Sequence, residues 1–465
     1  MPTWIQLVFL ACGVCFILAL KGLSGPRTAR NGNLLGAAAA VVACLMPFFW
    51  EDLHLQHVPL IIAAIAVGTI GGVYGARTVQ MTQMPQMVAL FNGVGGGAAA
   101  LVALLELHDV VETAANGGGD APWFTLAATA FTIAVGSISF AGSIVTFAKL
   151  QELMTARPVV FPGLPVVFGG SLVAALVLAG LLVDDPRMWV GVLLGLVGLL
   201  IGLLLVLPVG GADVPIVISL LNAFTGLTVA AGGYVLSNVL LLIAGTLVGA
   251  SGTFLTLLMA RAMGRSVTNI LFGALKGGST LGAGEASDRP VRSVNPEDAA
   301  IMLGYADRVI IVPGYGLAVA QAQHTLRELV DVLVEKGARV DYAIHPVAGR
   351  MPGHMNVLLA EAQVPYEQLR EMDQINGDFK DADVVLVVGA NDVVNPAAKT
   401  TPGAPIYGMP ILNADEARQV IFMKRSMRPG FAGIENELLF DEKTSLLFGD
   451  AKDSMGKLLN AVKAL

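Results

Sequence analysis

The first 260 residues of the chain form an almost unbroken series of apolar runs, and charged residues are rare within them. A helix needs about 20 apolar residues to cross a hydrocarbon core of about 30 Å. Nine runs have roughly that length, near residues 3–20, 33–50, 57–75, 84–105, 123–147, 164–183, 188–208, 214–232 and 237–259. The pattern predicts a polytopic α-helical membrane domain over residues 1–261.

The rest of the chain has another pattern, in which short β-branched runs alternate with amphipathic stretches. Runs typical of strands occupy residues 308–313, 339–345, 384–388, 419–423 and 445–448. A glycine turn follows the first run, and we expect a helix from that turn through Glu335. This alternation predicts a soluble α/β Rossmann-like domain with a doubly wound parallel sheet over residues 297–465. Residues 262–296 are Gly- and Ser-rich and are expected to form a linker.

The distribution of charge supports the same division. The chain is 55% apolar and 14% charged, with a net charge of −7. Up to Arg265 it has 9 Lys and Arg and 10 Asp and Glu, whereas the last 200 residues have 19 and 25. The negative net charge argues against a nucleic-acid partner. Cys12, Cys15 and Cys44 lie in apolar runs, which favours packing over a metal or redox site.

Basic residues gather in the loops on one side of the predicted bundle. The loops on that side carry Lys21, Arg27, Arg30, Arg77, Lys149, Arg157, Arg261 and Arg265. The other side carries Arg187 together with acidic residues, namely Glu51, Asp52, Asp109, Glu112, Asp120, Asp184 and Asp185. Because loops rich in Lys and Arg stay in the cytoplasm, we expect the N-terminus outside and the α/β domain inside.

A few polar side chains interrupt the apolar runs. Asn92 and Asn222 lie near the middle of the fourth and eighth runs, and Asp213 lies at the cytoplasmic end of the eighth. Two amides at equal depth could share a hydrated path, or each could join neighbouring helices, and both interpretations stay open. Ser137 and Ser139 are expected to bond to the backbone of their own helix. No histidine lies at mid-membrane depth.

The turn after the first strand has the pattern Gly314-x-Gly316-x-x-Val319. A strand before it and a helix after it favour a dinucleotide-binding turn, although a structural turn is the alternative. The second strand ends in Ile344-His345-Pro346, without a carboxylate for a ribose 2′-hydroxyl.

Cations at another strand end favour NADP over NAD. Lys424-Arg425-Ser426 offers two cations and a hydroxyl, which suit a 2′-phosphate. Arg350 could also bind a phosphate, and His354 is interpreted as structural. Asp392 could bond a ribose or carboxamide, or could serve in an Asx turn or as a helix N-cap. No catalytic side chain is expected, because nucleotide cofactors carry hydride chemistry themselves.

Several long segments, in order, resemble the beta subunit of proton-translocating NAD(P)+ transhydrogenase. The soluble half carries Pro313–Gln323, Ile344–Ala362, Gly389–Ala398, Lys424–Met427 and Gly449–Ala451, and the membrane half carries Gly210–Pro215 and Leu221-Asn222. The resemblance covers nearly the whole chain. It implies that the soluble domain binds NADP(H) and that a partner alpha subunit, with further membrane helices, binds NAD(H). It also implies direct hydride transfer coupled to inward proton movement, the bacterial inner membrane as location, and a dimer of the whole complex.

The resemblance further implies a set of nucleotide contacts. They are Tyr315, Gly316, Leu317, Ala318, Val319, Ala320, Val347, Ala348, Gly349, Arg350, Met351, Pro352, Gly389, Ala390, Asn391, Asp392, Val393, Gly408, Met409, Lys424, Arg425, Ser426, Met427, Arg428, Pro429, Gly430, Phe431, Asp450 and Ala451.

Two positions depart from the family pattern. Asn92 stands where many members have histidine, so we expect the titrating group to lie on the partner's helices. Phe431 stands where tyrosine is common. The alternative to an enzyme subunit is a transporter or channel gated by a cytoplasmic nucleotide-sensing domain.

Overall fold

The structure, a computed structural model, describes residues 2–49, 58–80, 83–117, 119, 121–151, 153–155, 158–210, 213–263, 266–272, 289–349, 353–402, 404, 406–430 and 432–465. The chain divides into two compact units. One comprises Met1–Val209 and Ile216–Thr256, and the other comprises Gly210–Pro215 and Leu257–Leu465.

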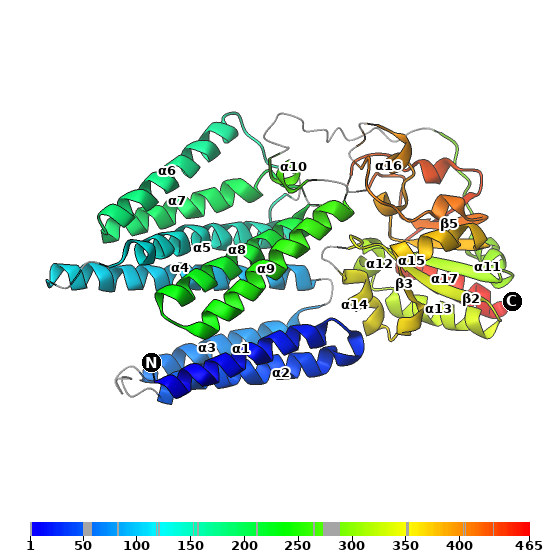
Figure 1. Ribbon diagram of the computed structural model, residues 1–465. Helices are drawn as coiled ribbons and strands as arrows, with labels where there is room; N and C mark the ends of the chain where they lie inside the picture. The colour runs from blue at the N-terminus through cyan, green and yellow to red at the C-terminus, as the bar shows by residue number, and fades with distance from the viewer. Residues whose placement is uncertain are drawn as a thin grey trace. The chain divides into compact units, whose positions relative to one another are not determined.

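In the described part of the first 262 residues, nine helices are long and apolar enough to cross a membrane (Figure 1). They are α1 (Thr3–Leu23), α2 (Pro26–Leu45), α3 (Val58–Thr78), α4 (Met84–Ala115), α5 (Trp123–Leu150), α6 (Leu164–Asp184), α7 (Met188–Val206), α8 (Val214–Val235) and α9 (Val239–Ala262). A short 3-10 helix, η1 (Met46–Phe49), follows α2. The helical membrane fold predicted from hydropathy is confirmed.

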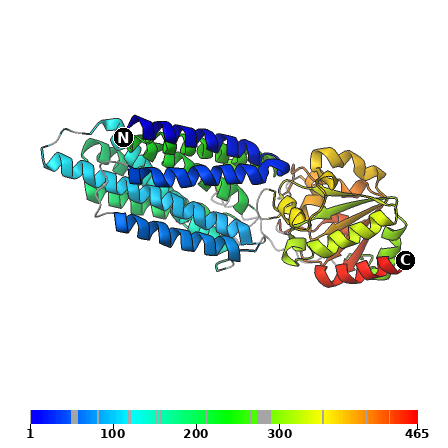
Figure 2. The ribbon, with the colours of Figure 1, turned by 90° about the horizontal axis from the view of Figure 1, so that it is seen from below.

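Close approach of the helices depends on small residues. A Cβ added to Gly226 of α8 would lie 2.3 Å from the backbone nitrogen of Gly249 on α9. A Cβ on Gly202 of α7 would lie 2.3 Å from the carbonyl oxygen of Ile138 on α5. Figure 2 shows the helices of this unit running alongside one another. Backbone contact of this kind replaces the hydrophobic driving force that lipid-facing helices lack.

Some charged residues expected in loops lie within helices. Asp109 and Glu112 belong to α4, which has 32 residues and is therefore about 48 Å long, longer than a hydrocarbon core. Lys149 lies in the last turn of α5 and is buried. Its ammonium donates to the carbonyl oxygens of Val206 (3.0 Å), Leu207 (2.7 Å) and Val209 (2.7 Å), so it caps the carboxyl end of α7. Of the other residues used for orientation, five lie outside the described residues, namely Glu51, Asp52, Asp120, Arg157 and Arg265.

The second unit contains a six-stranded parallel sheet in the order β3-β2-β1-β4-β5-β6. The strands are β1 (Arg308–Pro313), β2 (Arg339–Ile344), β3 (Leu369–Glu371), β4 (Val384–Val388), β5 (Gln419–Lys424) and β6 (Thr444–Phe448). The order reverses between β1 and β4, because the chain adds strands first on one side of β1 and then on the other. In doubly wound sheets ligands bind at this reversal, outside the carboxyl ends of the strands. The predicted fold class is confirmed.

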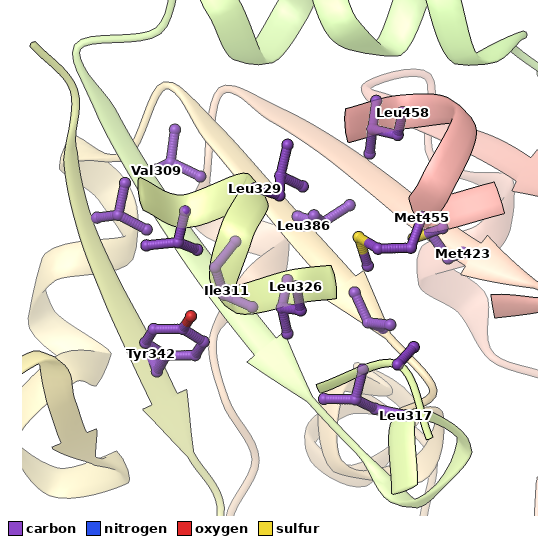
Figure 3. Packing of buried hydrophobic residues seen from close by; sticks show 14 of the residues in the cluster. Val309, Ile311, Leu317, Leu326, Leu329, Tyr342, Leu386, Met423, Met455 and Leu458 are labelled. Carbon is purple, nitrogen blue, oxygen red and sulfur yellow. The ribbon is translucent and has the colours of Figure 1, made fainter. Parts of the chain in front are cut away.

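Alternate residues of each buried strand face opposite layers of the domain. Val309, Ile311 and Leu386 pack against one layer, shown in part in Figure 3. Ile310 and Val385 pack against the other. The first layer includes α11 (Pro296–Gly304), α12 (Tyr315–Val319), α13 (Gln323–Glu335), α14 (His354–Glu361) and α17 (Ala451–Ala464). The second includes α15 (Met372–Ile375), η6 (Asn376–Asp381), η7 (Asp392–Val394), η8 (Ala414–Glu416) and η9 (Glu437–Phe440). Three further elements are η5 (Tyr366–Gln368), α16 (Ala397–Thr400) and, in the predicted linker, α10 (Val267–Phe272).

Two local predictions are wrong. The single helix expected after the glycine turn is two helices, α12 and α13, because Gln321 between them has a φ of 50°. No right-handed helix continues through such a residue. Strand β3 was not predicted from the sequence, since it has only three residues and two of them are charged.

Candidate functional site at the carboxyl ends of the strands

The loops after β1 and β4 meet where the strand order reverses. The backbone N–H of Gly314 donates to Val388 O, and that of Gly316 donates to Gly389 O, both at 2.9 Å. A Cβ on Gly314 would lie 2.4 Å from Ala390 Cα, and one on Gly316 would lie 2.7 Å from Gly389 Cα. Both glycines of the predicted fingerprint are therefore required for contact between two loops of the protein itself.

Gly389 has the strictest requirement of the three. Its φ of +71° lies in the left-handed region, and an added Cβ would lie 2.3 Å from the backbone nitrogen of Leu317. The side chains of Leu317 and Ala318 are fully buried in the core, so these two predicted contacts can offer a ligand only backbone atoms. Val319 is exposed.

The loop after β4 is joined to the loop after β5 through two polar residues. Lys424 Nζ donates to Asn391 Oδ1 at 3.2 Å, and the N–H of Ala432 donates to Asp392 Oδ2 at 2.9 Å. Asn391 Nδ2 donates to Asp392 Oδ1 at 3.0 Å. Gly430 is where the loops are closest, because a Cβ there would lie 2.6 Å from both Asn391 Nδ2 and Asp392 Oδ1. Asp392 is neither the N-cap of η7 nor confined to a local turn, since it bonds across to the β5 loop.

The cations predicted for a 2′-phosphate lie at this edge of the sheet. Lys424 is the last residue of β5 and is half-buried, whereas Arg425, Ser426 and Arg428 are exposed. Burial lowers the pKa of Lys424, and the carboxylates of Asp392 and Glu435 oppose that shift. A partly buried cation beside exposed ones suits a dianionic ligand, because the ligand's charge replaces hydration that the lysine has lost.

The carboxyl end of β6 lies beside the same lysine. The N–H of Gly449 donates to Lys424 O at 3.1 Å. Asp450 accepts from the N–H of Lys452 at 2.9 Å, so its carboxylate caps α17, and Ala451 begins that helix. The structure therefore places Asp450 and Ala451 near Lys424 and gives Asp450 a capping role.

One residue, His345, organises the loop after β2. From the sequence, this strand end was interpreted only as lacking a carboxylate. His345 is buried; its Nε2 donates to Pro410 O at 2.8 Å, and its Nδ1 accepts from the N–H of Val347 at 3.2 Å. These partners require the neutral ring. Burial lowers the pKa of His345 to about 4, against the effect of the bond to Pro410. The signal in the sequence was a histidine directly after an apolar strand.

The neighbouring turns at Gly349 and Tyr315 are linked through His354. Gly349 has a φ of +108°, and a Cβ there would lie 2.5 Å from Nδ1 of His354, the buried first residue of α14. The His354 ring centroid lies 6.3 Å from that of Tyr315. Met409 is buried in a small cluster with Ile406 and Ile411. The predicted contacts Arg350, Met351, Pro352 and Phe431 lie outside the described residues.

A separate polar cluster joins α4, α5 and α8. Asn92 Nδ2 donates to Ser143 Oγ (2.9 Å) and to Ser139 Oγ (3.4 Å). Ser139 Oγ donates to Leu221 O at 2.9 Å and lies 2.6 Å from Thr225 Oγ1. The prediction that Ser139 bonds to its own helix is wrong, because the carbonyl of a neighbouring helix is within reach. Ser143 and Thr225 were missed, although Ser143 follows Ser139 by one helical turn.

Two further polar residues were predicted in the membrane half. Asn222 lies within α8, and Asp213 lies just before it. Asn222 is half-buried and follows Leu221. Asp213 is buried and directly precedes α8, with its N–H donating to Gly210 O at 3.0 Å. Asn222 follows Asp213 by nine positions, which is about 14 Å along a helix.

Comparison with known proteins places this geometry in a family. Residues 5–461 match the family described as NAD(P) transhydrogenase beta subunit. Two curated relatives from Rhodospirillum rubrum, both called NAD(P) transhydrogenase subunit beta, are each 47% identical to the chain over 456 residues. The matched region covers 98% of this chain and 98% of each relative.

Proposed function

Because the chain belongs to the NAD(P) transhydrogenase beta-subunit family, we propose that its α/β domain binds NADP(H) and that NAD(H) binds to its alpha-subunit partner. Family membership makes the chain a membrane-embedded component of a proton-translocating enzyme that uses pyridine nucleotides. It does not favour a nucleotide-gated transporter or channel. When bound, NADP(H) supplies the hydride acceptor or donor for exchange with the nucleotide of the partner.

The observation that carries the NADP(H) assignment is the cluster of Lys424, Arg425 and Ser426 at the carboxyl end of β5. A half-buried lysine, held by Asn391, stands beside an exposed guanidinium and a hydroxyl. Arg425 and Ser426 are free of the core and could contact a 2′-phosphate directly. The end of β2 supports the same choice, since the neutral His345 stands where NAD-binding domains use a carboxylate. The remaining predicted contacts after β1, β2, β4 and β6 would hold the rest of the nucleotide.

For the membrane half we propose that protons move inward past the α4–α5–α8 cluster. Asn92, Ser139 and Thr225 can accept and donate hydrogen bonds but do not titrate near neutral pH. The titrating group would therefore be supplied by helices of the alpha subunit. Asp213, buried before α8, would carry the signal towards the nucleotide domain. We further propose a bacterial inner-membrane location with the N-terminus outside, the α/β domain in the cytoplasm, and a dimer of the whole complex.

Calorimetry on the full chain in detergent tests the nucleotide assignment. We expect NADP+ to bind at least about a hundredfold more tightly than NAD+, because a dianionic phosphate gains several charge-assisted hydrogen bonds. Arg425→Ala should reduce that preference about tenfold while leaving the contact between Lys424 and Asn391 intact. Arg418→Ala is the matched control, since Arg418 pairs with Asp383 at the other end of β5. Equal affinities for the two nucleotides would exclude the proposal.

The coupling role of Asp213 needs the complete enzyme. With the alpha subunit in sealed vesicles, reduction of an NAD+ analogue by NADPH should change the lumenal pH. Asp213→Asn should weaken that pH change while leaving NADP+ affinity intact, because Asp213 is not among the predicted nucleotide contacts. Proton pumping at the wild-type rate in this variant would remove Asp213 from the coupling path.

A further inference from the structure

Arg289 makes an unusually complete set of contacts for a residue near the surface. Its Nη1 donates to Glu437 Oε2 at 2.9 Å, and its Nη2 donates to Glu437 Oε1 and Glu435 Oε2, both at 3.1 Å. The guanidinium carbon lies 3.8 Å from the ring centroid of Phe440. We call Arg289, Glu435, Glu437 and Phe440 the Arg289 clasp. A two-pronged ion pair that also stacks on a ring has a defined geometry, unlike a single exposed pair.

The clasp is joined to the candidate nucleotide site through two asparagines. Asn395 Nδ2 donates to Glu435 O at 2.9 Å, and Asn395 Oδ1 accepts from the N–H of Glu437 at 3.3 Å. Between those residues, Asn436 Nδ2 donates to Asn391 O at 2.9 Å. Asn391 is the residue that accepts from Lys424. The path from Arg289 to the predicted phosphate-binding lysine therefore runs through hydrogen bonds and short stretches of chain within one folded unit.

Arg289 also lies close in sequence to the point where the chain pairs with the sheet. A few residues later the chain pairs with β6, because Val294 N–H donates to Leu446 O (3.0 Å) and Leu446 N–H donates to Arg292 O (2.8 Å). The carboxylates that Arg289 holds lie at the end of the loop that begins with Lys424 and Arg425. One side chain thus connects the segment that leads to the pairing with β6 to the loop that follows β5.

We propose that Arg289 is a positioning residue for the nucleotide site, holding residues 435–437 so that the loop after β5 keeps Asn391 and Lys424 in place. This inference rests on the proposed NADP(H) site. The clasp makes nucleotide affinity depend on the segment that leads to the pairing with β6. Displacing Arg289 would weaken NADP(H) binding without removing any group that contacts the nucleotide.

The test uses the full chain assembled with the alpha subunit, and it measures NADP+ affinity, the rate of NADP+ release and the unfolding temperature. We expect Arg289→Gln to weaken NADP+ binding about fivefold through faster release, a size in line with a partly exposed ion pair. The unfolding temperature should change little. Arg292→Gln is the matched control, because Arg292 lies three residues from Arg289 and its side chain is exposed. This variant should bind NADP+ like the wild type.

A double-mutant cycle separates positioning from general loss of charge. Glu437→Gln should weaken binding, and the double variant should be no worse than Arg289→Gln, since both substitutions break one unit. Arg289→Lys keeps the charge without the fork or the stacking and should show an intermediate loss, which also covers a failure of Arg289→Gln to fold. Wild-type release rates in Arg289→Gln, or additive losses in the cycle, would overturn the clasp while leaving the NADP(H) assignment intact. Failure of the wild type to prefer NADP+ over NAD+ would instead overturn the assignment on which it rests.

Discussion

Both units of the molecule bring backbones together at glycines, but they do so differently. In the membrane unit, Gly202 and Gly226 lie within regular helices, and the contact is spread along the length of a helix pair. In the α/β unit, Gly314, Gly316 and Gly389 concentrate it in one place, where two loops cross at the strand reversal. Gly389 also has a positive φ, which none of the glycines within the described helices has. Close packing in the bundle therefore requires only the small volume of glycine. Close packing in the domain also requires the backbone conformation that glycine allows.

The polar cluster of the membrane unit and the candidate nucleotide site also differ in their polar groups. The cluster between α4, α5 and α8 uses hydroxyls and an amide, which do not change charge near neutral pH. The candidate site contains the buried His345 and the half-buried Lys424, and both have lowered pKa values. We therefore expect pH to act on the stability of the nucleotide domain more than on the contacts of this cluster.

The largest effect is expected from Gly389→Ala. The added methyl would combine left-handed strain with a 2.3 Å contact to Leu317 N, at a cost of about 4 kcal/mol. Nucleotide binding should also be lost. Calorimetry measures the loss of binding, and unfolding of the full chain measures the loss of stability. Gly377→Ala is the control, because a Cβ at Gly377 would have nothing within 4 Å. A fully active Gly389→Ala protein would show that the crossing of the loops is not needed.

The next effect is the acid sensitivity of His345. Its pKa is lowered to about 4 in the folded domain, whereas in the unfolded chain it is near 6.5. The unfolded state therefore binds the proton first, so stability is complete above about pH 6.5 and falls as the pH is lowered towards 4. The full loss is about 3 kcal/mol. Hydrogen exchange of peptides from β2 in the full chain measures it.

His345→Gln isolates this contribution, because an amide can donate to Pro410 O and accept from Val347 without titrating. That variant should lose less protection than the wild type between pH 6.5 and 4. His324→Gln, at an exposed position of the same domain, should behave like the wild type. Identical pH profiles for His345→Gln and the wild type would mean that His345 is not the group responsible.

A smaller effect is expected in the bundle from Gly226→Ala. The methyl would lie 2.3 Å from Gly249 N, so α8 and α9 would have to separate, at a cost of about 2 kcal/mol. Thermal unfolding in detergent measures the change, and Gly180→Ala on α6 should leave it within about 0.5 kcal/mol because space is open there. If the Gly226 variant were instead as damaging as Gly389→Ala, the distinction between volume and conformation would fail.

Much of the fold could be predicted from the sequence because its signals are local. Among the described residues, hydropathy identified the nine membrane helices, and β-branched runs identified five of the six strands. Strand β3 could not be predicted from the sequence, since Leu369–Glu371 pairs only with β2 and has no apolar run of its own. The break at Gln321 was missed because no glycine or proline marks it.

The site could be predicted only as far as the strand ends. Parallel strands place their carboxyl ends on one edge, so the positions of Lys424, Gly389 and Gly314 followed from the alternation of strands and helices. The bonds between loops did not, because Ala432 and Asp392 are 40 residues apart and nothing in either segment indicates the other. Ser139 was assigned to the wrong partner for a related reason, since the carbonyl of Leu221 is available only once α5 and α8 are packed.

Asn391 uses every polar atom that it has on its side chain, as well as its carbonyl. Its Oδ1 faces the ammonium of Lys424, its Nδ2 faces the carboxylate of Asp392, and its carbonyl accepts from Asn436. Turning the amide over would set a donor against a cation and an acceptor against an anion. The charges of its two neighbours thus fix the orientation of the Asn391 amide. The amide dipole has its negative end towards Lys424 and its positive end towards Asp392.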